Sequence, residues 1–126
     1  MYCVAGGPGN KTTSVVYDGT NWTSGASLSG DGRRGTGGAM PSSSSLGFVC
    51  AGETATVNPI TITEEWNGTS FSSSTAIPTA TRDPGNGDGG TGEAGLVSGG
   101  HNASSITGAV FEWTGSQQTL KTITTA

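Results

Sequence analysis

The chain has 126 residues, of which 31% are hydrophobic and 11% are charged, and its formal net charge is −4. Its five Lys and Arg residues are too few for the basic surface that nucleic-acid binding needs, and no apolar run is long enough for a membrane span or a secretory signal. The polar residues are mostly Ser, Thr and Gly, including 23 glycines, and this composition favours one domain of short strands joined by tight turns.

Three short apolar runs, each ending in glycine, predict three strands. They lie at 3–7, 48–52 and 96–100. Their closing glycines are 45 and 48 positions apart along the chain: Gly7, Gly52 and Gly100. Regular spacing of this kind predicts an internal structural repeat.

A second repeated feature follows each apolar run, namely an aromatic residue and then a turn. The aromatic residues are 49 and 47 positions apart, and they are Tyr17, Trp66 and Trp113. A turn glycine stands two residues further on in each case: Gly19, Gly68 and Gly115. Asp-Gly and Asn-Gly at the first two turns predict β-hairpins, with the positive φ angles of a type I′ turn. A second aromatic residue follows these two turns, Trp22 in the first and Phe71 in the second.

A third repeated feature occurs twice, as Leu28 with Arg33 and as Ile77 with Arg82, again 49 positions apart. A repeat of about 47 residues that contains several hairpin signals predicts a four-stranded unit. We expect glycine-rich first strands at 35–42 and 87–93, followed by the apolar second strand. A third strand at 60–66 and a fourth at 71–77 complete the unit. The chain then forms a single segment of about 2.7 repeats, with units at 1–28, 29–77 and 78–126.

This order of features resembles the kelch motif of β-propellers, in which an apolar run ending in Gly-Gly precedes an aromatic residue and a Trp. The likeness rests on three stretches of the chain: Ala5-Gly6-Gly7 with Tyr17 and Trp22, Ala51-Gly52 with Trp66 and Phe71, and Ser98-Gly99-Gly100 with Trp113. Ala51 replaces the first glycine of the second pair, and Gln118 stands where the third unit lacks a second aromatic residue. The resemblance implies an all-β fold of kelch-like β-propeller blades.

The segment 63–71, Thr-Glu-Glu-Trp-Asn-Gly-Thr-Ser-Phe, is similar to repeats in propeller proteins of tailed bacteriophages, especially marine ones. That similarity implies a virion component, such as a tail-fibre, receptor-facing or decoration protein.

The number of repeats has a consequence for assembly. Propellers close with four to eight blades, so about 2.7 repeats make an incomplete ring. The first unit also begins at its second strand. Because open sheet edges need pairing, we expect a homo-oligomer or the remainder of a longer propeller.

Two groups of side chains are candidate ligand contacts. Trp22 and Phe71 suit stacking on sugar rings, although aromatic residues repeated at one blade position more simply pack between blades. Glu65 and Glu112 suggest the paired carboxylates of a glycosidase. They fall in different repeats, however, and more simply pair with loop amides or with the arginines at 33, 34 and 82.

The remaining candidate metal-binding and catalytic residues do not predict an enzyme. The loop 83–89 offers oxygen ligands, but its spacing departs from that of an EF-hand, and a solvated turn is expected. The copper site of a galactose-oxidase-type propeller enzyme needs more histidine and tyrosine ligands than His101, Tyr2 and Tyr17 supply. Cys3 and Cys50 are expected as buried free thiols rather than a disulfide, and they are too few for a zinc site. We expect no metal, no cofactor and no catalytic residue.

Three functions agree with these features. The first is a non-enzymatic structural or receptor-facing component of a virion, whose partners are other virion proteins or a cell-surface glycan. The second is an extracellular carbohydrate-binding propeller, and the third is an intracellular kelch-type scaffold for protein interactions. The expected location is the virion or the extracellular space.

Overall fold

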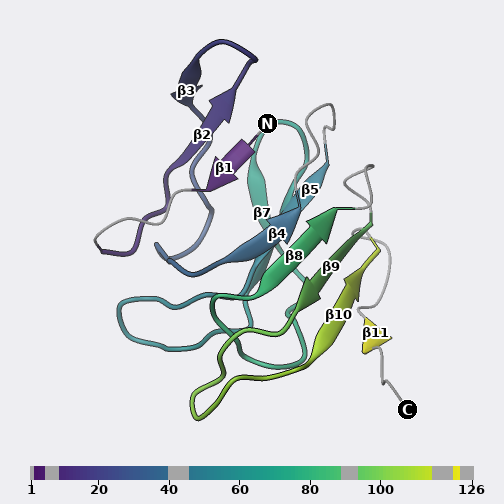
Figure 1. The fold of residues 1–126 in the computed structure, drawn as a ribbon. Coiled ribbons are helices and arrows are strands. Elements are labelled where there is room, and N and C mark those ends of the chain that lie inside the picture. The colour runs from purple at the N-terminus through teal and green to yellow at the C-terminus, as the bar shows by residue number, and fades with distance from the viewer. Residues whose placement is uncertain (1, 5–8, 40–45, 89–93, 115–120, 123–126) are drawn as a thin grey trace.

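A computed structural model describes residues 2–4, 9–39, 46–88, 94–114 and 121–122, and these residues form an all-β structure (Figure 1). Their strands make three separate antiparallel sheets, and none of these sheets closes on itself. Within the described part of the chain, no helix is long and apolar enough to cross a membrane.

The three sheets follow one another along the chain. The first has the order β1-β2-β3, with strands Tyr2–Val4, Ser14–Tyr17 and Trp22–Ser24. The second has the order β4-β5-β6-β7, with strands Gly37–Ala39, Gly47–Cys50, Thr63–Trp66 and Phe71–Ser74. The third has the order β8-β9-β10-β11, with strands Gly85–Asp88, Gly95–Ser98, Val110–Trp113 and Lys121–Thr122. In each sheet, neighbours in sequence are neighbours in space, and β4 lies beside β8 and β9 (Figure 1).

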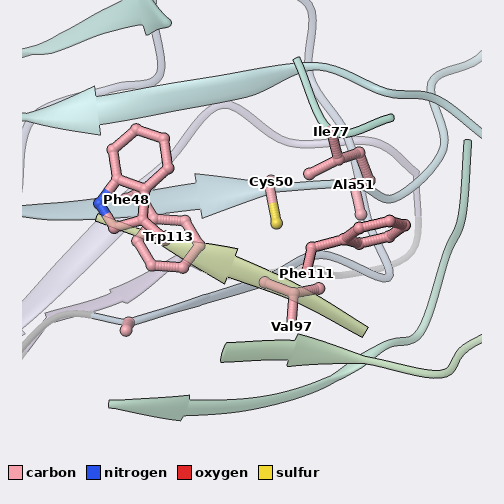
Figure 2. Close-up of a cluster of buried hydrophobic side chains, with 8 residues drawn as sticks. Phe48, Cys50, Ala51, Ile77, Val97, Phe111 and Trp113 are labelled. Carbon is pink, nitrogen blue, oxygen red and sulfur yellow. The ribbon is translucent and has the colours of Figure 1, made fainter. Parts of the chain in front are cut away.

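The core lies between successive sheets, because alternate side chains of a strand point to opposite faces. Phe48 and Cys50 of β5 face the third sheet, in a buried cluster whose other members are Ala39, Ala51, Ile77, Val97, Phe111 and Trp113 (Figure 2). The opposite face of the second sheet carries Val49, Trp66 and Phe71, which pack with Leu28 and Ala26 from the segment that follows β3. The second sheet is therefore apolar on both faces.

Strand register shows that the sheets are equivalent residue by residue. Trp66 pairs with Phe71 across one hairpin, as Tyr17 pairs with Trp22 across another. Tyr2 lies opposite Val16, as Phe48 lies opposite Glu65. Tyr2 thus takes the place of Phe48 in the first sheet. The alignment of the run beginning at Cys3 with the run beginning at Phe48 is wrong by one residue.

Several strands are shorter than expected or displaced. The expected strand 35–42 is β4, Gly37–Ala39, and its last three positions lie outside the described residues. The expected strand 87–93 is β8, Gly85–Asp88, and it begins two residues earlier, with 89–93 outside the described residues. The expected strand 60–66 begins at Thr63, while Ile60 makes only an isolated bridge to Thr81. The expected strand 71–77 ends at Ser74, and Ile77 enters the core.

The hairpin turns also differ from the expected geometry. Only the glycine of each turn has a positive φ, 109° at Gly19 and 95° at Gly68, so type I′ is wrong for both. Instead, each loop has four residues, and its first side chain closes it. Asp18 Oδ1 accepts hydrogen bonds from two backbone N–H groups of its loop, at 2.8 Å each, and Asn67 Oδ1 does the same at 2.9 Å. Because the side chain closes the loop, the first turn residue does not need the positive φ of a type I′ turn.

Candidate functional site: the surfaces between the sheets

An aromatic pair occupies the same hairpin position in the first and second sheets. The ring centroids of Tyr17 and Trp22 are 5.0 Å apart, and so are those of Trp66 and Phe71. The environments differ, because Trp66 and Phe71 are buried whereas Trp22 is 54% exposed. Phe71 is therefore not accessible as a ligand contact, and of the two candidates only Trp22 is open to solvent.

Trp113 shows how the third sheet contacts the second. Its ring stacks on Phe48 with centroids 4.7 Å apart and planes 26° from parallel (Figure 2). Trp113 is 2% exposed, and its indole Nε1 has no hydrogen-bond partner among the described residues. Trp66 and Trp113 thus occupy equivalent strand positions, and each is buried on the face that its sheet turns to the preceding part of the chain.

The closing glycines sit in backbone conformations that ordinary side chains rarely adopt. Gly52 has φ of 101° after Ala51 at 62°, and Gly100 has φ of 100° after Gly99 at 62°. A Cβ at Gly100 would lie 2.6 Å from Thr81 Oγ1 and 2.7 Å from the carbonyl oxygen of residue 82. Ala51 has the same left-handed conformation as Gly99, because φ is 62° in both residues. Gly7 and Gly115 lie outside the described residues.

A buried ion pair joins the segment that follows β3 to β6 of the second sheet, and sequence reasoning missed it. Arg33 Nη2 donates to Glu64 Oε1 at 2.5 Å, and both side chains are 1% exposed. Glu64 Oε2 accepts two further hydrogen bonds from Ser29, 2.6 Å from its backbone N and 2.7 Å from its Oγ. Burial lowers the pKa of the Arg33 guanidinium, and the charge of Glu64 opposes this shift. Within the described ranges, Arg33 Nε has no hydrogen-bond partner.

A signal for this pair was present in the sequence. Glu64 and Trp66 are two residues apart in one strand, so they share a face, and a buried Trp66 implies a buried Glu64. A carboxylate there needs a cationic partner.

The expected equivalence of Arg33 with Arg82 is wrong by one residue. Arg34 bridges to Glu53 in the way that Arg82 bridges to His101, and Arg33 bridges to Lys11 in the way that Thr81 bridges to Ile60. The segment after Leu28 has one residue more than the segment after Ile77, and this extra residue sets Arg33 between the sheets.

Arg34 and Arg82, which are more exposed than Arg33, pair with Glu53. Arg34 Nε lies 2.5 Å from Glu53 Oε1, and Arg82 Nε lies 3.8 Å from Glu53 Oε2. The arginines at 33 and 34 therefore pair with Glu64 and Glu53, rather than with Glu65 or Glu112. Burial raises the pKa of Glu65, and a hydrogen bond with Ser74 opposes the shift. Glu65 and Glu112 lie at equivalent positions of different sheets, opposite Phe48 and Leu96 respectively.

The other candidates for chemistry are placed as follows. Cys50 is a buried free thiol, as expected, and burial raises its pKa to about 12. For Cys3 the structure describes the backbone alone, as part of β1. His101 directs Nδ1 to the carbonyl oxygen of Asn102 at 2.6 Å. Asp83, in the loop considered for calcium, accepts a hydrogen bond from Arg82 Nη1 at 3.0 Å. No group of three or more His, Cys, Asp or Glu side chains within the described ranges could hold a metal ion.

Aromatic stacking, the ion pair and the two apolar clusters therefore occupy the spaces between the sheets. No protein-family model matches the chain, and a search of curated proteins finds no match.

Proposed function

We propose that the three sheets are blades of a kelch-like β-propeller that acts as a non-enzymatic structural or binding module. The observation that carries the proposal is the packing of the third sheet on the second. Trp113 of β10 lies in one buried cluster with Ile77, which follows β7, and Trp66, at the position equivalent to Trp113, lies in one with Leu28, which follows β3. One relation between neighbouring sheets thus occurs twice, as in the radial repetition of propellers.

The first strands agree with this geometry. In a propeller, the first strands of neighbouring blades converge on a central channel, where side chains have little room. A Cβ at Gly37 would lie 2.8 Å from Pro84 Cγ, and one at Gly38 would lie 2.3 Å from the carbonyl oxygen of Phe48. Glycine at both positions lets β4 approach its neighbours.

The proposed setting is the exterior of a virion, in a structural or receptor-facing role. Its support is the similarity of residues 63–71 to repeats of phage propeller proteins, together with the use of the buried charged groups in packing. Mass spectrometry of purified particles tests it, and peptides of this chain should sediment with intact virions at a fixed copy number. Recovery of the protein only from the unassembled fraction would reject the virion role and leave the propeller untouched.

Carbohydrate binding is a second candidate, and the exposure of Trp22 favours it. A 54% exposed indole beside the ring of Tyr17 offers an aromatic face to a sugar ring. Glycan-array binding that is lost in Trp22→Ala and retained in Val57→Ala, another exposed apolar position, would support this function. Binding that is equal in both variants would reject Trp22 as the contact.

A further inference from the structure

The contact between the second and third sheets serves as an internal template. Phe48 of the second sheet is 1% exposed because the ring of Trp113, from the third sheet, stacks on it at 4.7 Å. Cys50 shares that face of the second sheet and is also fully buried. A sheet of this repeat therefore buries its Phe48 face under the Trp113 face of the sheet that follows.

The third sheet repeats the Phe48 face without a cover among the described residues. Leu96 lies opposite Glu112, as Phe48 lies opposite Glu65, so Leu96 is the counterpart of Phe48. Leu96 is 45% exposed, although Val97, its neighbour on the opposite face, is 1% exposed. The third sheet thus presents a partly apolar face to solvent.

The first sheet repeats the covering face. Tyr17 pairs with Trp22 as Trp66 pairs with Phe71, and Trp66 and Trp113 are equivalent in turn. Tyr17 is therefore the counterpart of Trp113. Trp22, beside it, is 54% exposed. The third sheet therefore presents the face equivalent to that of Phe48, which a following sheet would cover. The first sheet presents the face equivalent to that of Trp113, which would cover a preceding sheet.

We infer that the first sheet of a second copy of this chain packs on the third sheet, with Tyr17 and Trp22 of that copy over Leu96. This inference rests on the proposed propeller architecture. The contact is heterologous, because two different faces meet, and such contacts form rings when their rotation closes. Two copies supply six sheets, within the four to eight of closed propellers, whereas three copies exceed that range. For the 126-residue chain, the inferred assembly is a ring of two copies.

The test is the mass of the purified 126-residue chain across a concentration series, measured by analytical ultracentrifugation. Wild type should sediment as two chains. Trp22→Asp and Leu96→Asp should each raise the dissociation midpoint by more than about tenfold, because each buries an unpaired carboxylate. Val57→Asp is the matched control, since Val57 is 53% exposed in the loop between β5 and β6, and it should leave the midpoint unchanged. Circular dichroism of all variants should retain the wild-type strand signal.

Mixing the two variants tests the head-to-tail orientation. Each variant keeps the face that the other has lost, so an equimolar mixture should form a two-chain species through one intact contact. A folded wild-type monomer, association equally strong in Trp22→Asp and wild type, or a mixture no heavier than its components would overturn the inference. A saccharide as the natural occupant of the Trp22 face would leave the wild-type chain monomeric. The virion experiment above is independent of all these outcomes.

Discussion

Removing the charge of Glu64 should destabilise the fold more than any surface substitution. Glu64 and Arg33 are both 1% exposed, and their closest atoms are 2.5 Å apart. At an effective dielectric constant of about 20, unit charges at that distance attract by roughly 7 kcal/mol, which offsets the several kcal/mol that desolvation of each ion costs. Glu64→Gln cancels the attraction and leaves Arg33 buried with its charge. We expect a loss of about 3–5 kcal/mol in the free energy of unfolding.

Urea denaturation at fixed protein concentration, followed by the fluorescence of the buried Trp66 and Trp113, measures this loss. Arg34→Met is the matched control, because the Arg34 side chain is 54% exposed in its pair with Glu53 and should contribute at most about 1 kcal/mol. A Glu64→Gln variant no less stable than this control would refute the argument.

A double variant separates the attraction from the desolvation. Arg33→Met with Glu64→Leu removes both charges together, so it should be more stable than either single change alone. It should not exceed wild type by much, because the Ser29 backbone N–H and hydroxyl lose their acceptor, at about 1–3 kcal/mol. Simple additivity of the two single losses would show that the charges do not interact.

Three further predictions concern single positions. Gly100→Ala adds a steric clash to backbone strain, whereas Gly19→Ala, with open space around its Cβ, adds strain alone, so Gly100→Ala should melt at the lower temperature; equal melting would contradict the close approach at Gly100. Backbone hydrogen bonds from its own turn lower the pKa of Asp18, so an NMR titration should place that pKa below the ordinary value of an aspartate. The stability that Asp18 contributes is then present above its pKa in the unfolded chain and is lost as pH falls through its pKa in the folded chain. Asp18→Asn should remove this pH-dependent component of stability. A titration that shows no lowered pKa for Asp18 would refute the prediction. Burial raises the pKa of Cys50 to about 12, so in a Cys3→Ser background its thiol should resist alkylation at pH 8 until urea unfolds the chain, and rapid native labelling would contradict the burial.

Repeated features of the sequence predicted the all-β class and the main hairpins. Spacing alone brought Tyr17, Trp66 and Trp113 into correspondence, because a strand position in one sheet recurs at the same position in the next. Leu28 and Ile77 correspond as well, since each donates its backbone N–H to a carbonyl oxygen 16 residues earlier in the chain. The spacing of the repeats thus predicted which residues occupy equivalent positions in different sheets.

The interactions between the sheets were harder to predict. The single extra residue after Leu28 moves Arg33 inward, and spacing by whole repeats does not reveal such a shift. The turn geometry depended on Asp18 and Asn67 closing four-residue loops with their side chains, which competes with the type I′ preference of Asp-Gly and Asn-Gly. Residue types were visible in the sequence, whereas the partner of each side chain depended on local register.

The ion pair also bears on how this array can change by gene duplication. Within the second unit, Arg33 faces Glu64; within the third unit, Thr81 takes the place of Arg33 and Phe111 that of Glu64. Unequal crossing-over that brought the segment carrying Thr81 against a copy of the strand carrying Glu64 would leave a carboxylate buried without its cation. Recombinants of this kind would fold poorly and be lost. A crossover within a unit, between the positions of Arg33 and Glu64, is therefore selected against, whereas an exchange of whole units keeps the pair together.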